Sequence, residues 1–120
     1  MLKKLLQQGV SEKMIDKEQK TRYEVRAKIL KALAHPNRMM MVDALAEGER
    51  CVCELRDLVG ADTSTVSKHL SVMKNAGIVD YEKRGLQVYY RLKVPCITNF
   101  FGCIEAVIAE EAREYGAALS

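Results

Sequence analysis

The stretch that most constrains the fold is residues 61–79, ADTSTVSKHLSVMKNAGIV. Asp62 is a good N-cap residue, because its carboxylate can accept hydrogen bonds from the unpaired N–H groups of a first helical turn. After it, apolar residues recur on one side of a helix, at Val66, Leu70 and Met73. Gly77 can adopt the left-handed conformation that ends many helices. The pattern predicts a short amphipathic helix.

The opposite side of this predicted helix is rich in hydroxyl groups and positive charge. Such side chains donate hydrogen bonds to phosphates and base edges, and a slim helix of this kind fits the major groove of a DNA duplex. We therefore predict a DNA recognition helix. The residues expected to contact DNA are Thr63, Ser64, Thr65, Ser67, Lys68 and His69.

The neighbouring segments predict a helix-turn-helix followed by a hairpin. Residues 51–59, CVCELRDLV, are expected to form a short helix, which a tight turn at Gly60 joins to the recognition helix. Two β-prone runs follow, at 78–82 and 86–92, and Gly85 lies in the short turn between them. The tip of this hairpin is basic, and we expect it to lie along the DNA phosphates as a wing, through Lys83 and Arg84.

The length of 120 residues predicts one domain, at residues 18–115, between an N-terminal arm (1–17) and a short tail (116–120). The last helix, expected at 96–115, has an apolar stripe that is large for so small a domain, and this favours oligomerisation. The net charge is only +3, but residues 64–93 are basic and the last helix is acidic. That distribution suits a protein that meets DNA with one face.

Several function classes are not indicated by the sequence. No apolar run is long enough to cross a membrane, and the first residues lack a signal-peptide core, so we expect a cytoplasmic protein. Cysteines are usually reduced there, which favours thiols or metal ligands over structural disulfides for the four cysteines. No histidine is placed to activate a cysteine nucleophile, and no phosphate-binding glycine loop occurs, so an enzyme is not expected.

Taken together, these motifs resemble the ArsR/SmtB family of repressors over roughly residues 25–110. The resemblance is carried by Pro36-Asn37-Arg38 and by residues 49–55 (ERCVCEL), 64–70 (STVSKHL), 75–79 (NAGIV) and 88–92 (VYYRL). It implies a homodimeric, mainly α-helical winged helix-turn-helix with a small β-hairpin, in which helices 18–34 and 96–115 form the dimer interface. It also implies a repressor that binds double-stranded operator DNA without a cofactor and is released by an inducer.

The pair Cys51 and Cys53 resembles the arsenic- and antimony-sensing branch of that family. There the corresponding helix carries Cys-Val-Cys and commonly a third cysteine three residues further on, where this chain has Arg56. Thiolates select soft ions, so the expected inducer is As(III) or Sb(III), with Cd(II) and Pb(II) as further candidates. Trivalent arsenic binds three sulfurs, and the third would come from Cys96 or Cys103, in the same protomer or its partner.

The spacing of the cysteine pair also suggests a mechanism. Two residues apart on a helix, Cys51 and Cys53 would point about 200° away from each other. Binding one ion with both should then distort the start of the helix at 51–59, which supports the recognition helix, and so lower DNA affinity. The alternative inducer is oxidation or persulfidation of the same cysteines, which requires reactive thiols but no ion.

Overall fold

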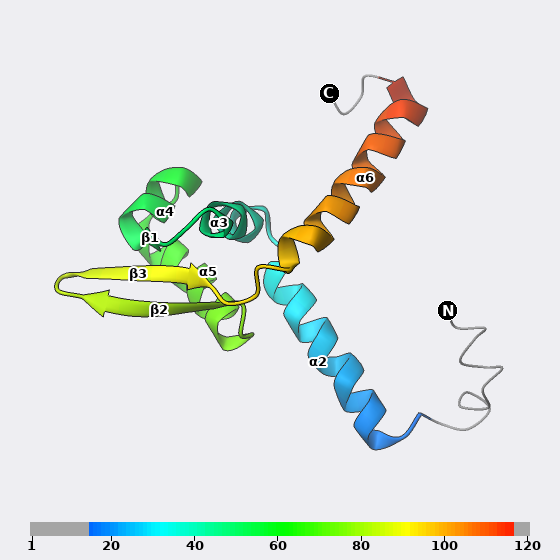
Figure 1. Cartoon of the computed structure of the whole chain (residues 1–120), viewed down its shortest axis with the longest axis horizontal. Coiled ribbons are helices and arrows are strands. Elements are labelled where there is room, and N and C mark those ends of the chain that lie inside the picture. The colour runs from blue at the N-terminus through cyan, green and yellow to red at the C-terminus, as the bar shows by residue number, and fades with distance from the viewer. Residues whose placement is uncertain (1–14, 117–120) are drawn as a thin grey trace.

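The computed structural model describes residues 15–116 and has the architecture of a winged helix-turn-helix (Figure 1). The predicted N-terminal arm and tail lie almost entirely outside these residues. Along the chain the elements are α2 (Lys17–Leu33), α3 (Pro36–Ala46), β1 (Arg50–Cys51), α4 (Val52–Val59), α5 (Thr63–Asn75), β2 (Val79–Arg84), β3 (Gln87–Leu92) and α6 (Ile97–Tyr115). The predicted combination of helices and one hairpin is therefore confirmed.

A single hydrophobic core holds α3, α4, α5 and the hairpin together. The predicted apolar side of the recognition helix is confirmed, because Val66, Leu70 and Met73 are all 0% exposed. Around them pack fully buried residues from the neighbouring elements, namely Met41, Val42, Leu55, Ile78 and Val79. Because one side of α5 is buried in the core, its opposite side faces the solvent.

Local chemistry sets both ends of α5. At its start, Oδ1 of Asp62 accepts a hydrogen bond from the backbone N–H of Thr65 at 2.7 Å, as an N-cap does. At its end, Gly77 has a φ of 81°, which an L side chain rarely adopts, and the chain turns there into β2. Gly60, with a φ of 74°, likewise ends α4 and makes the tight turn that leads into α5.

The helix predicted at residues 51–59 begins one residue later, because Cys51 belongs to a short strand. β1 pairs antiparallel with β3, with Cys51 opposite Tyr89 and Arg50 opposite Tyr90. The hairpin thus becomes a three-stranded sheet in the order β1-β3-β2. A two-residue strand has no alternating pattern of its own, and only its pairing with a distant strand defines it.

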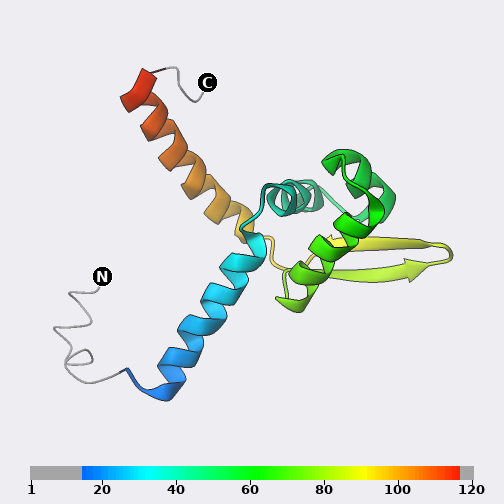
Figure 2. The same ribbon diagram turned by 180° about the vertical axis from the view of Figure 1, so that it is seen from behind.

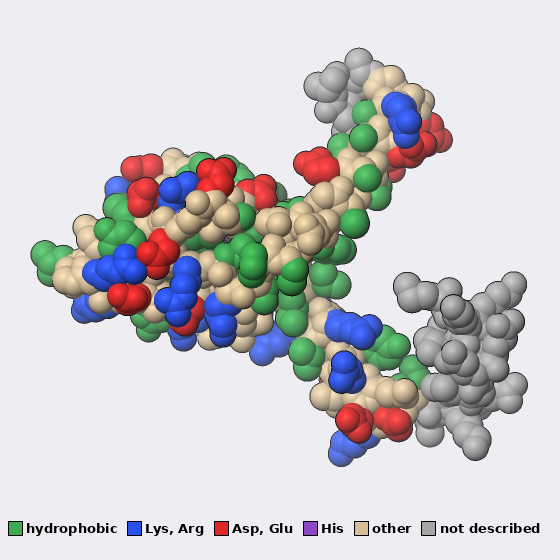
Figure 3. Space-filling view, in the orientation of Figure 1, with side chains coloured by type: hydrophobic (Ala, Val, Ile, Leu, Met, Phe, Trp, Pro, Cys, Tyr) green, Lys and Arg blue, Asp and Glu red, His purple; other side chains and the backbone are tan. Residues whose placement is uncertain are grey.

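The helices α2 and α6 project from the core as two separate arms (Figures 1 and 2). Only Ala32 and Leu33 are buried in α2, and α6 has no buried residue among the side chains that the structure describes. Apolar side chains therefore remain uncovered on both arms (Figure 3). The radius of gyration is 18.3 Å, against about 13 Å for a compact domain of about 100 residues. Within residues 15–116, no helix has the length and apolar character needed to cross a membrane.

Candidate nucleic-acid interface and cysteine site

The first turns of α5 present most of the predicted DNA-contacting side chains to solvent. Four of them are exposed, namely Thr63, Ser64, Ser67 and Lys68, while Thr65 is half-buried. Asp62 holds this turn, since it also accepts a hydrogen bond from the Ser64 hydroxyl at 2.8 Å. These hydrogen bonds, led by the backbone N–H of Thr65, lower the pKa of Asp62, so the cap stays charged at neutral pH.

The prediction that His69 contacts DNA is wrong, because its side chain lies on the buried side of α5. It is 9% exposed, and its ring centroid lies 4.3 Å from that of His35. Burial first, and then the nearby charges of His35 and Arg38, lower the pKa of His69. Sequence spacing could have revealed this position, since His69 follows Val66 by three residues and completes the inward-facing stripe.

At the tip of the wing, the two predicted basic residues differ in their surroundings. Arg84 donates through Nε to Glu82 and through Nη2 to Glu49, each at 3.0 Å, and its guanidinium lies 4.7 Å from the ring centroid of Tyr89. The bonded Arg84 lowers the pKa of Glu82. Lys83 is exposed and has no ion-pair partner among residues 15–116. Arg84 therefore braces the wing, and Lys83 is the cation at its tip that has no ion-pair partner among the described residues.

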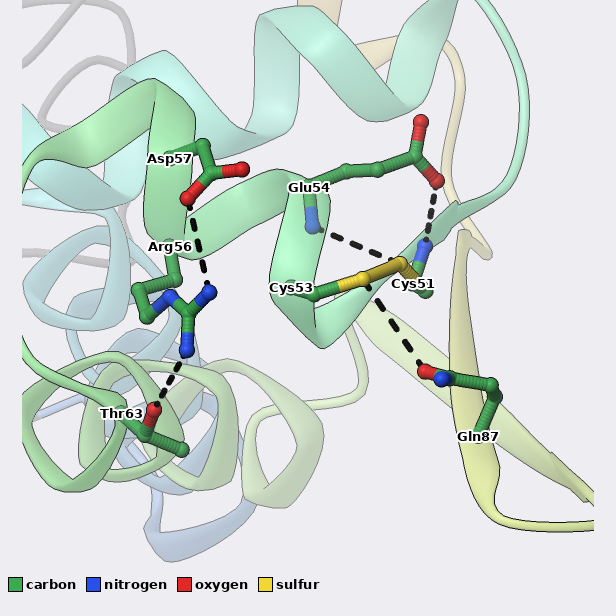
Figure 4. Close-up of a disulfide and its surroundings, with 7 residues drawn as sticks. All are labelled: Cys51, Cys53, Glu54, Arg56, Asp57, Thr63 and Gln87. Atoms are coloured by element: carbon green, nitrogen blue, oxygen red, sulfur yellow. Dashed lines mark hydrogen bonds and ion pairs between the residues drawn. A yellow bond between two sulfur atoms is a disulfide. The ribbon is translucent and has the colours of Figure 1, made fainter.

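The structure joins Cys51 to Cys53 in a disulfide (Figure 4), which contradicts the expectation that this pair consists of free thiols. Their Cα atoms are 5.4 Å apart. Cys51 precedes the helix, with extended backbone angles (φ −76°, ψ 162°), so its side chain turns back over the first turn of α4. The premise that both cysteines lie within one helix and point apart is therefore wrong, while distortion of the helix by a bound ion stays a prediction.

Residues from two elements surround this cysteine pair. Cys51 caps α4, because its Sγ accepts from the backbone N–H of Glu54 at 3.4 Å while Oε1 of Glu54 accepts from the N–H of Cys51 at 3.0 Å. On the other side, Sγ of Cys53 lies 3.9 Å from Oε1 of Gln87 on β3 (Figure 4). The pair thus lies between α4 and the wing.

A third sulfur does not approach the pair within one chain. Cys96 and Cys103 are free and exposed, at the start of α6 and further along it. In the part of the chain that the structure describes, no three His, Cys, Asp or Glu side chains are gathered closely enough to hold a metal ion. A single chain therefore offers a soft ion two sulfurs, those of Cys51 and Cys53, once their disulfide is reduced.

Arg56, which occupies the place of the family's third cysteine, is directed away from the pair (Figure 4). Its Nη1 donates to Oγ1 of Thr63 at 3.4 Å, and its Nη2 lies 3.6 Å from the carboxylate of Asp57. Arg56 thus connects α4 to the first residue of the recognition helix.

Comparison with known proteins places this architecture in a family. The family model "Bacterial regulatory protein, arsR family" matches residues 35–81, from the N-cap of α3 into β2. The crystal structure of the transcriptional repressor BigR from Xylella fastidiosa is 35% identical, with a TM-score of 0.62, and the match covers 76% of this chain and 96% of that chain. The chain belongs to the ArsR family of bacterial regulatory proteins.

Two further matches support the assignment to the ArsR family. A homodimeric winged helix-turn-helix DNA-binding domain from Mycobacterium bovis is 28% identical, with a TM-score of 0.69, over 88% of this chain and 96% of that chain. A homolog of the cadmium resistance regulatory protein CadC from Staphylococcus aureus is 43% identical over 67 residues, 55% of each chain. The matches span about half the length of the first curated relatives (41–58%). All are described as regulators, which confirms that the chain is not an enzyme.

Proposed function

We propose that this ArsR-family protein is a transcriptional repressor that binds double-stranded operator DNA through α5 and the wing. The observation that carries the proposal is the division of α5 into two sides. One side is fully buried in the core, and the other exposes hydroxyl and basic side chains at Ser64, Ser67 and Lys68. Lys83 adds an accessible cation at the wing tip. A protein with this function works where the chromosome is, which makes a cytoplasmic location part of the proposal.

We infer that the repressor acts as a homodimer held together by α2 and α6. Both helices leave large apolar side chains exposed in the single chain, among them Val25, Leu30, Phe100 and Val107. Burial of such surface is the main driving force for protein association. The M. bovis relative is itself described as homodimeric, which favours the same arrangement for this chain.

For the inducer, we propose a soft ion bound by the thiolates of Cys51 and Cys53. The Cys-Val-Cys motif favours As(III) or Sb(III), and the CadC relative, named for cadmium resistance, supports Cd(II) as strongly. Reduction of the disulfide by two electrons, from a thiol reductant, supplies the two ligands. Because no third sulfur approaches within one chain, we propose that Cys96 or Cys103 of the partner protomer completes the site.

This arrangement suggests that ion binding lowers DNA affinity by a route other than distortion of α4. An ion held by α4 of one protomer and α6 of the other would fix the geometry of the dimer and so the spacing of its recognition helices. Coupling free energies between two sites are typically about 1–3 kcal/mol, which corresponds to a change in DNA affinity of roughly 5–150-fold.

A DNA-release titration of the reduced protein tests the proposal. Wild type and the variants Cys51→Ser, Cys53→Ser, Cys96→Ser and Cys103→Ser are bound to an operator duplex and titrated with arsenite, antimonite, Cd(II) and Pb(II). We expect loss of release in the first two variants and in one of the last two, with the other as matched control. Equal release in all four variants, or none from wild type, would refute the thiolate site.

The disulfide itself supports a second candidate function, in which oxidation is the inducer. The structure joins Cys51 to Cys53 directly, and closing this bond needs only a two-electron oxidant such as a peroxide. If oxidation is the signal, peroxide or persulfide should release DNA from wild type but not from Cys53→Ser, and arsenite should have no effect on the reduced protein. The reverse pattern supports the soft-ion inducer.

A further inference from the structure

The only two histidines of the chain meet at the junction between α3 and the recognition helix. His35 is the N-cap of α3, His69 lies on α5, and their ring centroids are 4.3 Å apart. His69 is buried and His35 is half-buried. Neither belongs to the exposed face of α5 or to the cysteine pair, so the proposed repressor function leaves them without a role.

Arg38 fixes the protonation state of His69. The Nη1 atom of Arg38 lies 3.1 Å from Nδ1 of His69. A guanidinium keeps its charge and has only donors, so Nδ1 of His69 must be the acceptor and carries no proton. The imidazole of His69 is therefore neutral in this arrangement, with its proton on Nε2.

The Nδ1 atom of His35 is also occupied as an acceptor. It receives a hydrogen bond from the backbone N–H of Asn37 at 3.0 Å, and this bond caps α3. A proton on that nitrogen would remove the lone pair and leave the N–H of Asn37 without its partner. Each histidine thus makes its structural hydrogen bond only while Nδ1 is deprotonated.

The groups around His69 do not compensate a positive charge on its ring. From α3 the ring is faced by His35 and Arg38, and no carboxylate acts on it within the described residues. The α2 helix contributes the backbone carbonyl of Lys31, to which Nη2 of Arg38 donates at 3.4 Å. The other elements packed on α5, which are α4 and β2, set no titratable group against the ring.

We propose that His69, packed against His35 and Arg38, is a pH switch that loosens the contact between α3 and the recognition helix in mildly acidic solution. Protonation of His69 at Nδ1 breaks its bond with Arg38 and sets two cations side by side. The recognition helix then loses its support from α3, and DNA affinity falls. Only this last step rests on the proposed DNA-binding function.

The direction of the pH effect follows from the two states of His69. In the unfolded chain a histidine takes up its proton near pH 6.5, whereas burial and the adjacent cations lower the pKa of His69 in the folded protein. The unfolded state therefore binds more protons in mild acid. Stability is complete above about pH 6.5 and falls below it, with the unfolding constant rising up to about tenfold per pH unit for one group.

The test uses the reduced full-length protein and two non-titrating variants. His69→Gln keeps an oxygen that can accept from Arg38, and His35→Asn keeps a good N-cap. Operator affinity and urea unfolding are measured from about pH 8 to about pH 5.5 at constant ionic strength, with a duplex selected from a random library. We expect wild-type affinity to fall by up to about tenfold over this range, and the double variant, which has no histidine, to change little.

Nitrogen-15 NMR of wild type supplies a readout that does not depend on the variants. It should show the His69 proton on Nε2 at neutral pH. A proton on Nδ1, an unchanged wild-type unfolding constant, or an unchanged pH slope in the double variant would each overturn the switch. If the protein binds no duplex at any pH, the proposed repressor function fails, while the unfolding slope and the NMR tautomer still decide the switch.

Discussion

Cys51 uses one sulfur atom for two purposes. Its Sγ caps the first turn of α4 by accepting from the N–H of Glu54, and the same atom is bonded to Cys53. Sulfur is a weak acceptor, and serine is among the preferred N-cap residues. The residue at position 51 therefore suits sulfur chemistry better than helix capping, and the two roles can be separated by substitution.

In the reduced protein, Cys51→Ser should keep the cap of α4, whereas Cys51→Ala should remove it. We expect the alanine variant to be less stable than the serine variant by about 0.5–2 kcal/mol in urea unfolding, the usual cost of losing an N-cap. Cys53→Ala is the matched control, because that exposed side chain caps nothing. Equal stability of the two Cys51 variants would show that a capping side chain at position 51 does not stabilise α4.

Lys83 and Arg84 are neighbours in sequence and should differ in their contribution to DNA binding. Lys83→Ala should reduce the slope of log affinity against log salt by about one, because an accessible cation that meets a phosphate displaces about one counterion. Arg84→Ala should change the slope less, since Glu82 and Glu49 already neutralise that charge. Fluorescence anisotropy with an operator duplex over a series of salt concentrations measures both, and equal slopes would contradict the distinction.

The α6 helix has an apolar side and an opposite polar side. Its role in dimerisation can therefore be tested by placing the same charge on one side or the other. Val107→Glu places a charge on the uncovered stripe, whereas Ala106→Glu places it about 100° further round the helix, away from the stripe. We expect Val107→Glu to weaken the dimer by at least about tenfold in sedimentation equilibrium, because a buried unpaired charge is costly. Since Val107 is 61% exposed in the single chain, the core should be unaffected. Equal dimerisation of the two variants would refute an interface at this stripe.

Most elements could be predicted from sequence because their signals are local. The spacing of Val66, Leu70 and Met73, with Asp62 before and Gly77 after, defines α5 without reference to the rest of the chain. The short strand β1 could not be predicted, since it exists only through its ladder with β3. Without β1, Cys51 was assigned to a helix, and the geometry of the cysteine pair was wrong as a consequence.

Side-chain pairing was less predictable than the elements for a related reason. Arg84 meets Glu49 across 35 positions of sequence, and Arg38 meets His69 across 31. No local pattern records such contacts, and a histidine in a row of polar residues suggests exposure. One of the six predicted DNA-contacting residues on α5, His69, is buried. Its spacing of three residues from Val66 already indicated a place on the buried side of the helix.

At the scale of the whole molecule, two features of the single chain are incomplete in the same way. The apolar sides of α2 and α6 have no cover, and the cysteine pair has no third sulfur within reach. A partner protomer would bring a second α6 helix, with its own Cys96 and Cys103. We therefore propose that dimer assembly completes the ion site as well as the hydrophobic interface, so that an ion can act on the relation between the two recognition helices.

A rigid dimer should read two half-sites at one fixed separation. Helix-turn-helix dimers place their recognition helices about 34–36 Å apart, one turn of DNA. Inserting about five base pairs between the half-sites turns one of them to the far side of the duplex, and affinity should fall toward the non-specific level, typically weaker by about 10³ or more. The same insertion outside the half-sites is the control and should have no effect. The reduced protein loaded with its ion should bind the control duplex roughly 5–150-fold more weakly, so its affinities for the two duplexes should differ less than those of the ion-free protein. If the central insertion proves harmless, each recognition helix binds independently, and the ion must then act within one protomer, through the contact of Arg56 with Thr63.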